Sequence, residues 1–388
     1  MMKRIAILGS TGSIGTQALA LVRDGRRAMF DVVALVARRS EAALVQQAVE
    51  FGADAACLVD GSERPASLPA KTAFHAGADG VLAALEETDP DLVLNGITGA
   101  AGLRASEWTL RRGKTLALAN KESLVMAGPY LMALAASQGA HILPVDSEHC
   151  AIFQCLHGEP KARVRRIHLT GSGGPFRTRP LDTFATITPR EALQHPTWNM
   201  GPRITVGSAT MMNKAFEILE AHWLFGLQPE QIHVVLHPQS IVHSMVEFVD
   251  GSILAQLGVP DMRVPILYCL TWPERTPFAF EPFDPLKFRS LTFEPADAAR
   301  YPALPLAFAA LQAGGDSGAV LNAADEVMTE LFLAGRIPFP AITANVARVL
   351  QQHPPEPIRS LDDVLRADAA ARAAARALAT QTEAGAAP

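Results

Sequence analysis

Asp146 and Glu148 carry the first chemical signal in the sequence, because they stand two residues apart where an apolar run ends. If the chain is still extended at both positions, the two carboxylates point to one side of it. Two carboxylates that face one way repel each other unless a cation lies between them, and oxygen ligands without cysteine suit Mg²⁺ or Mn²⁺. The alternative is the start of a helix, where acidic side chains lie near the positive end of the helix dipole. The spacing alone leaves both interpretations open.

The segment from Ser208 to Glu220 offers a further carboxylate. The Ser208 side chain is suited to cap a helix. Asn213 and Glu217 are four residues apart in that helix, so both lie on one side of it with Lys214 beside them. One interpretation is a surface ion pair between the lysine and the glutamate. The other is a third metal carboxylate beside a lysine that binds phosphate.

A glycine-rich turn directly follows the first apolar run. Gly9, Gly12 and Gly15 are spaced G-x-x-G-x-x-G, and a helical pattern follows them. Glycines permit a tight turn, and backbone N–H groups at a helix N-terminus bind a pyrophosphate. Because strand, turn, helix and position in the chain agree, we predict a dinucleotide site rather than a purely structural turn.

The end of the second apolar run favours NADP over NAD. An NAD site usually has an acidic residue there for the ribose hydroxyls, whereas this chain has Arg38, Arg39 and Ser40. Two guanidiniums and a hydroxyl suit the 2′-phosphate of NADP. The alternative is a pair of solvated arginines without a ligand.

Two loops complete the polar groups. Residues 169–176 form a strand end that runs into glycines around Ser172, a pattern suited to hydroxyl and N–H contacts with a phosphate. The stretch 188–203 holds Trp198 and Met200 between a proline and a glycine. We interpret this stretch as a lid that covers the substrate and excludes water.

Alternating strand and helix signals surround the first of these motifs. Strands are expected at 4–8, 31–36, 55–59, 91–95 and 115–119, with helices from the glycine turn to 21, at 41–51 and at 101–112. Buried apolar strands that alternate with helices indicate a parallel sheet covered on both faces.

From about His141 the pattern is that of a second sheet. Strands are expected at 167–170, 232–236, 245–249 and 252–255, with a hairpin turn at 249–252. We therefore predict an α/β protein in three domains. These are an N-terminal Rossmann-like parallel sheet (1–145), a central α+β catalytic domain (146–272) with the lid 188–203, and, after a linker (273–305), a C-terminal helical domain (306–388).

The composition narrows the class of protein. The chain has 388 residues, a formal net charge of −5 and only 6% aromatic residues, which argues against nucleic acid as a partner. No secretory signal or long apolar stretch is read, so we expect a cytoplasmic protein that does not enter a membrane. The order His149, Cys150, Cys155, His157 matches no zinc spacing, and we expect buried thiols there.

Taken together, the motifs resemble those of one family, the 1-deoxy-D-xylulose 5-phosphate reductoisomerases. The similarity covers essentially the whole chain. It rests on ordered segments at 9–15, 119–122, 146–149, 170–176, 195–201, 208–214, 237–240, 256–258 and 260–263. At Arg38, Arg39 and Ser40 this chain departs from the Gly-Lys-Asn that is frequent in the family.

The resemblance assigns roles to individual residues. It implies NADPH contacts from Thr11, Gly12, Ser13, Ile14, Asn120, Glu122 and Gly201. These add to the cofactor contacts that the sequence pattern itself predicts for Gly9, Arg38, Arg39 and Ser40. It implies that Asp146, Glu148 and Glu217 hold the metal. It implies substrate contacts from Lys121, Ser147, Glu148, Ser172, His195, Ser208, Asn213, Lys214 and Glu217, with Trp198 and Met200 in the lid over the substrate.

The resemblance also implies the reaction. An NADP-dependent oxidoreductase of this family rearranges and reduces 1-deoxy-D-xylulose 5-phosphate to 2-C-methyl-D-erythritol 4-phosphate in non-mevalonate isoprenoid synthesis. It uses Mg²⁺ or Mn²⁺, with Co²⁺ as a further candidate, and it is a homodimer. The carbon skeleton moves by retro-aldol and aldol steps or by a direct ketol shift, and Lys121 polarises the substrate or transfers a proton; the sequence leaves both choices open.

Two alternatives come from other classes. A semialdehyde or homoserine-type dehydrogenase would share the glycine turn, and the semialdehyde kind would need a nucleophilic cysteine, for which Cys150 is the candidate near the site. A non-catalytic NADP sensor would bind the cofactor without needing Asp146, Glu148 and Glu217 together. Dependence of activity on a divalent metal separates the reductoisomerase from both.

Overall fold

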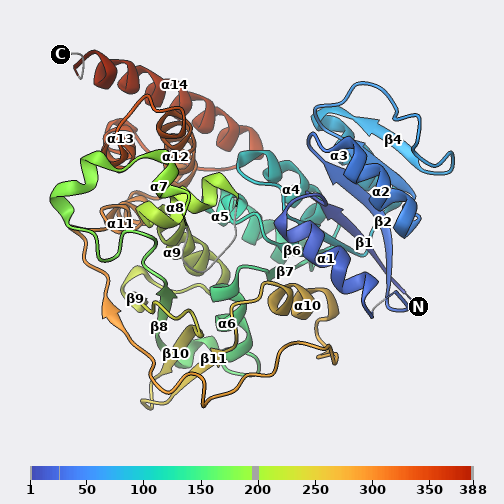
Figure 1. Cartoon of the computed structure of the whole chain (residues 1–388), viewed down its shortest axis with the longest axis horizontal. Coiled ribbons are helices and arrows are strands. Elements are labelled where there is room, and N and C mark those ends of the chain that lie inside the picture. The colour runs from blue at the N-terminus through green and yellow to red at the C-terminus, as the bar shows by residue number, and fades with distance from the viewer. Residues whose placement is uncertain (1, 26, 195–200, 386–388) are drawn as a thin grey trace. The chain divides into compact units, whose positions relative to one another are not determined.

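The structure is a computed structural model that describes residues 2–25, 27–194 and 201–385, and it divides into two compact units (Figure 1). The first unit comprises Met1–Ser123, Leu131–Cys150 and Asp261–Phe280. The second comprises Leu124–Tyr130, Ala151–Pro260 and Glu281–Pro388. Within the described ranges, no helix combines the length and the apolar character needed to cross a membrane.

A seven-stranded parallel sheet forms the core of the first unit, in the order β4-β3-β2-β1-β5-β6-β7. Its strands are β1 (Lys3–Leu8), β2 (Phe30–Ala37), β3 (Ala55–Leu58), β4 (Ala73–Ala76), β5 (Leu92–Asn95), β6 (Thr115–Leu118) and β7 (His141–Pro144). The central strands are apolar along their length because helices cover both faces of the sheet. The strand order reverses between β1 and β5, and ligands of such sheets bind beyond the carboxyl ends of the strands at that point.

Helices connect the strands of this sheet. They are α1 (Ser13–Arg23), α2 (Glu41–Phe51), α3 (Gly77–Thr88), α4 (Leu103–Arg111), α5 (Glu122–Gln138), α6 (Ser147–Cys155) and, later in the chain, α10 (Arg263–Thr271). The chain passes from one unit to the other within α5 and within α6. Five of these seven strands were expected from the sequence. β4, which is short and half-exposed, was missed together with α3 behind it, and β7 was not expected in this sheet because the pattern from His141 onward was assigned to the second one.

A mixed five-stranded sheet, ordered β11-β10-β8-β9-β12, organises the second unit. Its strands are β8 (Val164–Gly171), β9 (Ile232–Leu236), β10 (Val242–Phe248), β11 (Ile253–Leu257) and β12 (Glu294–Pro295). Only the β8–β9 pair of this sheet is parallel, so the carboxyl ends of β8 and β9 lie at the same end of the sheet. The predicted hairpin between β10 and β11 is present, closed by the Phe248 N–H, which donates to the Ser252 carbonyl at 2.9 Å.

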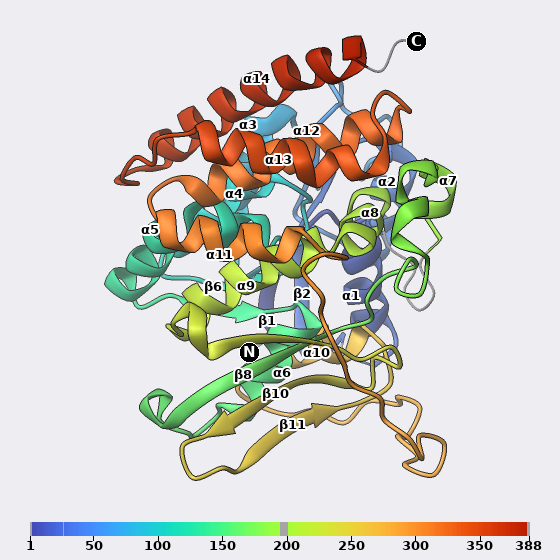
Figure 2. The same ribbon diagram turned by 90° about the vertical axis from the view of Figure 1, so that its left-hand side faces the viewer.

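The second unit is otherwise helical. Its helices are α7 (Pro189–Ala192), α8 (Pro202–Thr210), α9 (Met212–Phe225), α11 (Ala303–Ala313), α12 (Ser317–Leu333), α13 (Phe339–Gln352) and α14 (Leu361–Gly385). It also contains short 3₁₀ helices at Lys161–Arg163, Leu181–Thr186 and Pro229–Gln231, and the first unit contains one at Ala100–Gly102. Figure 2 shows α12 and α13 side by side with α14 along them. Gly318 permits the close approach of α12 to the start of α5, since a Cβ there would lie 2.0 Å from the Val125 carbonyl oxygen. The predicted fold class is confirmed: a parallel N-terminal sheet, a mixed second sheet and a helical C-terminal region.

Candidate active site

The glycine turn after β1 lies at the point where the strand order reverses. Gly9 has φ +77°, and a Cβ on it would lie 2.7 Å from the Gly96 carbonyl oxygen, so the loops after β1 and β5 touch there. A Cβ on Gly15 would lie 2.4 Å from the Gly9 oxygen, and α1 therefore packs directly on the turn. Gly12 is the N-cap of α1 and offers no side chain to cap it. The first N–H groups of α1 thus face a tight, positively polarised turn, as the sequence predicted.

Asn120 and Glu122 fix the neighbouring loop after β5. The Asn120 amide donates to the carbonyl oxygens of Ile97 (2.7 Å) and Gly99 (2.9 Å), and a Glu122 carboxylate oxygen accepts the Gly99 N–H at 3.0 Å. Both side chains are buried. Their contacts within this unit hold the loop after β5 in place. From the sequence they were assigned only to NADPH, without this structural role.

Arg38 and Arg39 have a partner that the sequence analysis missed. The Asp60 carboxylate, just beyond β3, pairs with the Nε atoms of Arg38 (3.2 Å) and Arg39 (2.7 Å). Both arginine side chains are about three-quarters exposed, at 73% and 74%. The two guanidiniums lower the pKa of Asp60, the hydrogen bond from Arg39 being the largest cause. β2 and β3 are adjacent and parallel, and this pairing brings residues more than twenty positions apart together.

Asp146 lies just before α6 and not in a strand, so the extended-chain argument for Asp146 and Glu148 is wrong. β7 ends at Pro144 and α6 begins at Ser147, which places Glu148 in the first helical turn. One Asp146 oxygen accepts the Glu148 N–H at 3.3 Å, and the other pairs with the Lys121 ammonium beyond the end of β6. Of the two alternatives, the structure shows the helix start, and the cation beside Asp146 in it is the Lys121 ammonium.

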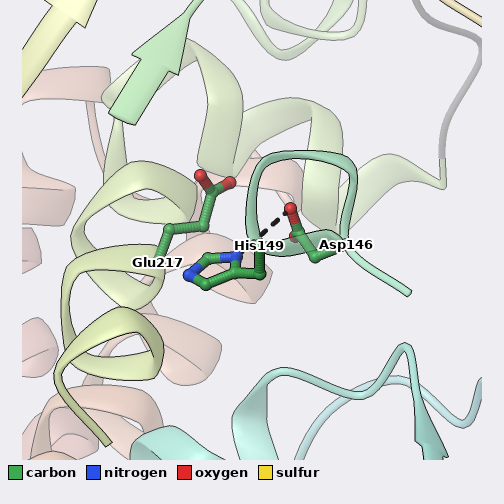
Figure 3. A group of neighbouring side chains, drawn as sticks. All are labelled: Asp146, His149 and Glu217. Atoms are coloured by element: carbon green, nitrogen blue, oxygen red, sulfur yellow. Dashed lines mark ion pairs between the residues drawn. The ribbon is translucent and has the colours of Figure 1, made fainter. Parts of the chain in front are cut away.

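His149 belongs to the same cluster. Its Nδ1 atom lies 3.5 Å from an Asp146 oxygen, and its ring is fully buried (Figure 3). In the sequence, His149 stands next to Cys150, and only a zinc site was weighed there. The three-residue spacing from Asp146 across the start of a helix was the signal that could have identified the pair.

Glu217 is a buried carboxylate of the second unit, also drawn in Figure 3. It accepts from the Asn213 amide at 2.6 Å and pairs with the Lys214 ammonium. The surface ion-pair interpretation is wrong, because the Lys214 and Glu217 side chains are only 4% and 1% exposed. A buried pair of this kind is costly to desolvate, which makes it a stronger functional signal than an exposed one.

The glycine-rich loop after β8 packs against the same two helices. A Cβ on Gly171 would lie 3.0 Å from Lys214 Cε, and a Cβ on Gly174 would lie 2.6 Å from the Ser208 carbonyl oxygen. Ser172 stands between these two contacts and accepts the Gly174 N–H on its hydroxyl at 3.3 Å. Ser208 lies inside α8 and is not the N-cap of α9, so that expectation was wrong. Ser208 and Lys214 nevertheless lie against the loop that carries Ser172, and Asn213 precedes Lys214 in α9.

Part of the predicted lid lies outside the described residues, namely His195, Trp198 and Met200. The stretch before it forms α7, whose N-terminus is closed by a capping box between Thr188 and Glu191. Gly201 is the N-cap of α8, and a Cβ there would meet nothing within 4 Å.

Three family models match the chain and together cover most of it. Residues 5–128 match 1-deoxy-D-xylulose 5-phosphate reductoisomerase, residues 142–225 match its C-terminal domain, and residues 257–374 match the DXP reductoisomerase C-terminal domain. The chain belongs to the 1-deoxy-D-xylulose 5-phosphate reductoisomerase family. Among the relatives, the reductoisomerase of Anaeromyxobacter sp. (strain K) is 49% identical over 94% of both chains. That of Geobacter metallireducens is 47% identical over 97% of this chain and 99% of the relative.

Solved structures of reductoisomerases have the same fold. The enzyme from Zymomonas mobilis in complex with NADPH has a TM-score of 0.90 at 42% identity, covering 98% of this chain and 99% of that one. A DOX-P reductoisomerase in complex with NADPH, fosmidomycin and magnesium has a TM-score of 0.90 at 36% identity, covering 98% of each chain. The predictions of the family, the fold class and the enzyme class are confirmed.

Proposed function

We propose that this protein rearranges and reduces 1-deoxy-D-xylulose 5-phosphate to 2-C-methyl-D-erythritol 4-phosphate, with NADPH and a divalent metal ion, in non-mevalonate isoprenoid synthesis. The observation that carries this proposal is the near-complete match of the chain to reductoisomerases. The buried carboxylates and the glycine turn are groups of the kind that this chemistry uses, which supports the proposal. Solved relatives hold NADPH, magnesium and fosmidomycin, which supports a small-molecule ligand here.

The turn at Gly9–Gly15 fits NADPH. A side chain at Gly9 or Gly15 would fill the space against the next loop or the helix, so the glycines keep the backbone open to a pyrophosphate. We assign the cofactor to Gly9, Thr11, Gly12, Ser13, Ile14, Arg38, Arg39, Ser40, Asn120, Glu122 and Gly201. When bound, NADPH supplies the hydride.

The carboxylates fit a divalent cation. Asp146 and Glu217 are each paired with a lysine, and a buried carboxylate favours a positive partner of this kind. We assign Asp146, Glu148 and Glu217 as ligands of Mg²⁺ or Mn²⁺, with Co²⁺ as a further candidate. The bound metal would supply Lewis-acid polarisation of the substrate carbonyl.

The lysines and hydroxyls then act on the substrate. Lys121 holds its ammonium beside Asp146, from which it can donate a hydrogen bond or a proton to a substrate oxygen. Ser172, Ser208, Asn213 and Lys214 would bind the phosphate, and this remote binding energy orients the reacting carbons. We further assign substrate contacts to Ser147, His195, Trp198 and Met200, the last two in a lid that excludes water.

The decisive experiment is NADPH oxidation with 1-deoxy-D-xylulose 5-phosphate. We expect turnover with Mg²⁺ or Mn²⁺, loss of turnover in EDTA, and no inhibition by thiol alkylation, since burial keeps cysteines unreactive and raises the pKa of Cys155 to about 11. The product is measured by mass spectrometry. Metal-independent oxidation that alkylation stops would favour a semialdehyde dehydrogenase, and NADPH binding without any turnover would favour a sensor.

Replacement of Arg38 and Arg39 by alanine tests the choice of cofactor. Each charged contact to a phosphate is stronger than a neutral hydrogen bond, so we expect the KM for NADPH to rise about 10-fold or more and the KM for NADH to change little. Steady-state kinetics with each cofactor measure both constants. Equal changes in the two constants would contradict a role for these arginines at the 2′-phosphate.

The larger organisation is also proposed. We propose three functional parts, with residues 1–145 binding NADPH, 146–272 carrying the metal and substrate residues, and 306–388 forming a helical domain after the linker. We propose that the enzyme is a cytoplasmic homodimer. The resemblance to the family supports the dimer, and exposed Ile253 and Leu254 on the edge strand β11 are compatible with a partner surface.

A further inference from the structure

The segment Thr292–Tyr301, here called the strap, crosses the edge of the second sheet before α11. It includes β12, which pairs with the end of β9. The carboxyl ends of β8 and β9 lie side by side, because the two strands are parallel neighbours. The strap therefore runs past the loop that carries Ser172, although more than a hundred residues separate the two in the chain.

Three strap residues contact the glycine-rich loop or the residues directly after it, up to Arg179. The Tyr301 hydroxyl donates to the Gly173 carbonyl at 2.9 Å. The Arg300 guanidinium donates to the carbonyls of Phe176 (3.0 Å) and Arg179 (2.7 Å). The Glu294 carboxylate receives both of its hydrogen bonds from Arg177, at 2.6 and 2.8 Å. The loop backbone and the strap are thus joined at several successive points.

The loop conformation needs such support. Gly173 and Gly174 have φ of +83° and +68°, and glycine loses more backbone freedom on ordering than any other residue. A Cβ on Gly173 would lie 3.1 Å from the Tyr301 hydroxyl, whereas one on Gly174 would meet the Ser208 carbonyl oxygen at 2.6 Å. The loop is therefore held between the strap on one side and α8 on the other.

Tyr301 is well suited to hold the loop. Its side chain is only 2% exposed, and burial raises its pKa to about 12, so the hydroxyl keeps its proton and remains a donor. The strap is itself anchored elsewhere, because His237 Nδ1 donates to the Thr292 carbonyl at 2.8 Å while His237 Nε2 accepts the Ile241 N–H at 3.1 Å. Phe293 stacks on that imidazole with a centroid distance of 4.8 Å. Loss of the Tyr301 hydroxyl would remove the support of the Gly173 carbonyl and leave the strap in place.

We propose that Tyr301 is a positioning residue for the substrate phosphate, acting through the Gly173 carbonyl on the loop that presents Ser172. Arg300 supports the same loop from the next position. This inference rests on the proposed function, because it assumes that Ser172 binds the phosphate of 1-deoxy-D-xylulose 5-phosphate. It also explains the motif at 237–240, which anchors the strap and does not need to contact the substrate.

The test is Tyr301→Phe, which removes one hydroxyl and keeps the ring. We expect the KM for 1-deoxy-D-xylulose 5-phosphate to rise about 5- to 10-fold, as for the loss of one buried hydrogen bond, with kcat and the Kd for NADPH within about twofold of the wild type. Calorimetry with NADP⁺ and Mg²⁺, which allows no reduction, should show the same loss of affinity for this substrate. The affinity for unphosphorylated 1-deoxy-D-xylulose should not change.

Thr72→Val is the matched control. The Thr72 hydroxyl is buried in the first unit and donates to the Ala53 carbonyl at 2.8 Å, so this variant loses the same kind of bond away from the loop. It should lower the melting temperature as Tyr301→Phe does, without changing the KM. Arg300→Gln should raise the KM in the same direction as Tyr301→Phe.

The outcomes separate two failures. A wild-type protein that does not turn over the phosphorylated sugar would overturn the proposed function. A wild-type protein that does, together with a Tyr301→Phe variant of unchanged KM, or one that loses affinity equally for both sugars, would overturn the role of Tyr301.

Discussion

Glu217→Gln is expected to lower kcat/KM at least about 100-fold, while the Kd for NADPH stays within about twofold of the wild type. Replacement of residues that only support a metal ligand already costs about 10- to 100-fold in affinity or activity, and the loss of a ligand carboxylate should cost more. The amide keeps the shape of the side chain but removes its charge. The Lys214 ammonium, which now pairs with that carboxylate in a buried setting, would lose its partner.

The measurement titrates Mg²⁺ and Mn²⁺ into the NADPH oxidation assay and follows NADPH binding separately by fluorescence. Removal of one partner of a buried ion pair also destabilises a fold, by about 3–5 kcal/mol, so thermal unfolding must first show that the variant is folded. Glu247→Gln serves as the control, since Glu247 pairs with Arg165 and Arg166 on the sheet of the same unit and has no place in the site. A folded Glu217→Gln variant with nearly normal kcat would refute the metal assignment.

Gly15→Ala should weaken NADPH binding on the order of 100-fold, because misplacement of a binding element by about 1 Å has effects of that size. The new Cβ would lie 2.4 Å from both the Gly9 carbonyl oxygen and Ser10 Cα, which is too close for any real contact. Helix α1 would have to move off the turn and carry its N-terminal N–H groups with it. The chemistry of the residues in the second unit would be untouched.

Fluorescence titration with NADPH measures the effect on binding, and calorimetry checks that the protein is folded. Gly258→Ala is the control, because a Cβ at that position would have only ordinary contacts, the nearest at 3.6 Å, and its φ needs no glycine. Normal NADPH affinity in the Gly15→Ala variant would show that the glycine turn does not hold the pyrophosphate.

Local patterns in the sequence predicted most of the elements. Buried parallel strands need apolar runs of a few residues, and Leu92–Asn95 or Thr115–Leu118 are such runs. Strand β4 has a half-exposed pattern with no such contrast, so it was missed together with α3. The glycine turn was predicted because its requirement is local: a sharp turn followed at once by a helix.

The candidate site was predicted less evenly. The residue types at Asp146 and Glu217 indicated oxygen ligands. Spacing could not show whether Asp146 stands in a strand or at the start of a helix, nor whether Glu217 and Lys214 form an exposed or a buried ion pair. Helix α6 begins at Ser147 because the chain leaves β7 two residues earlier, which is a matter of sheet geometry. Lys214 and Glu217 are buried because α9 packs beneath the glycine-rich loop and against α11.

By itself, therefore, the sequence determined the family, most of the strands and helices, and which residue types are present for binding a dinucleotide, a metal and a phosphate. These properties depend on neighbours within a few positions or on ordered motifs. The tertiary structure decided which groups meet: Asp60 with Arg38 and Arg39, His149 with Asp146, and Tyr301 with Gly173. The Asp60 and Tyr301 contacts join segments far apart in the chain, so they arise only when strands pair and loops pack, and no local pattern encodes them. The His149 contact spans three residues, but it forms only because a helix begins there.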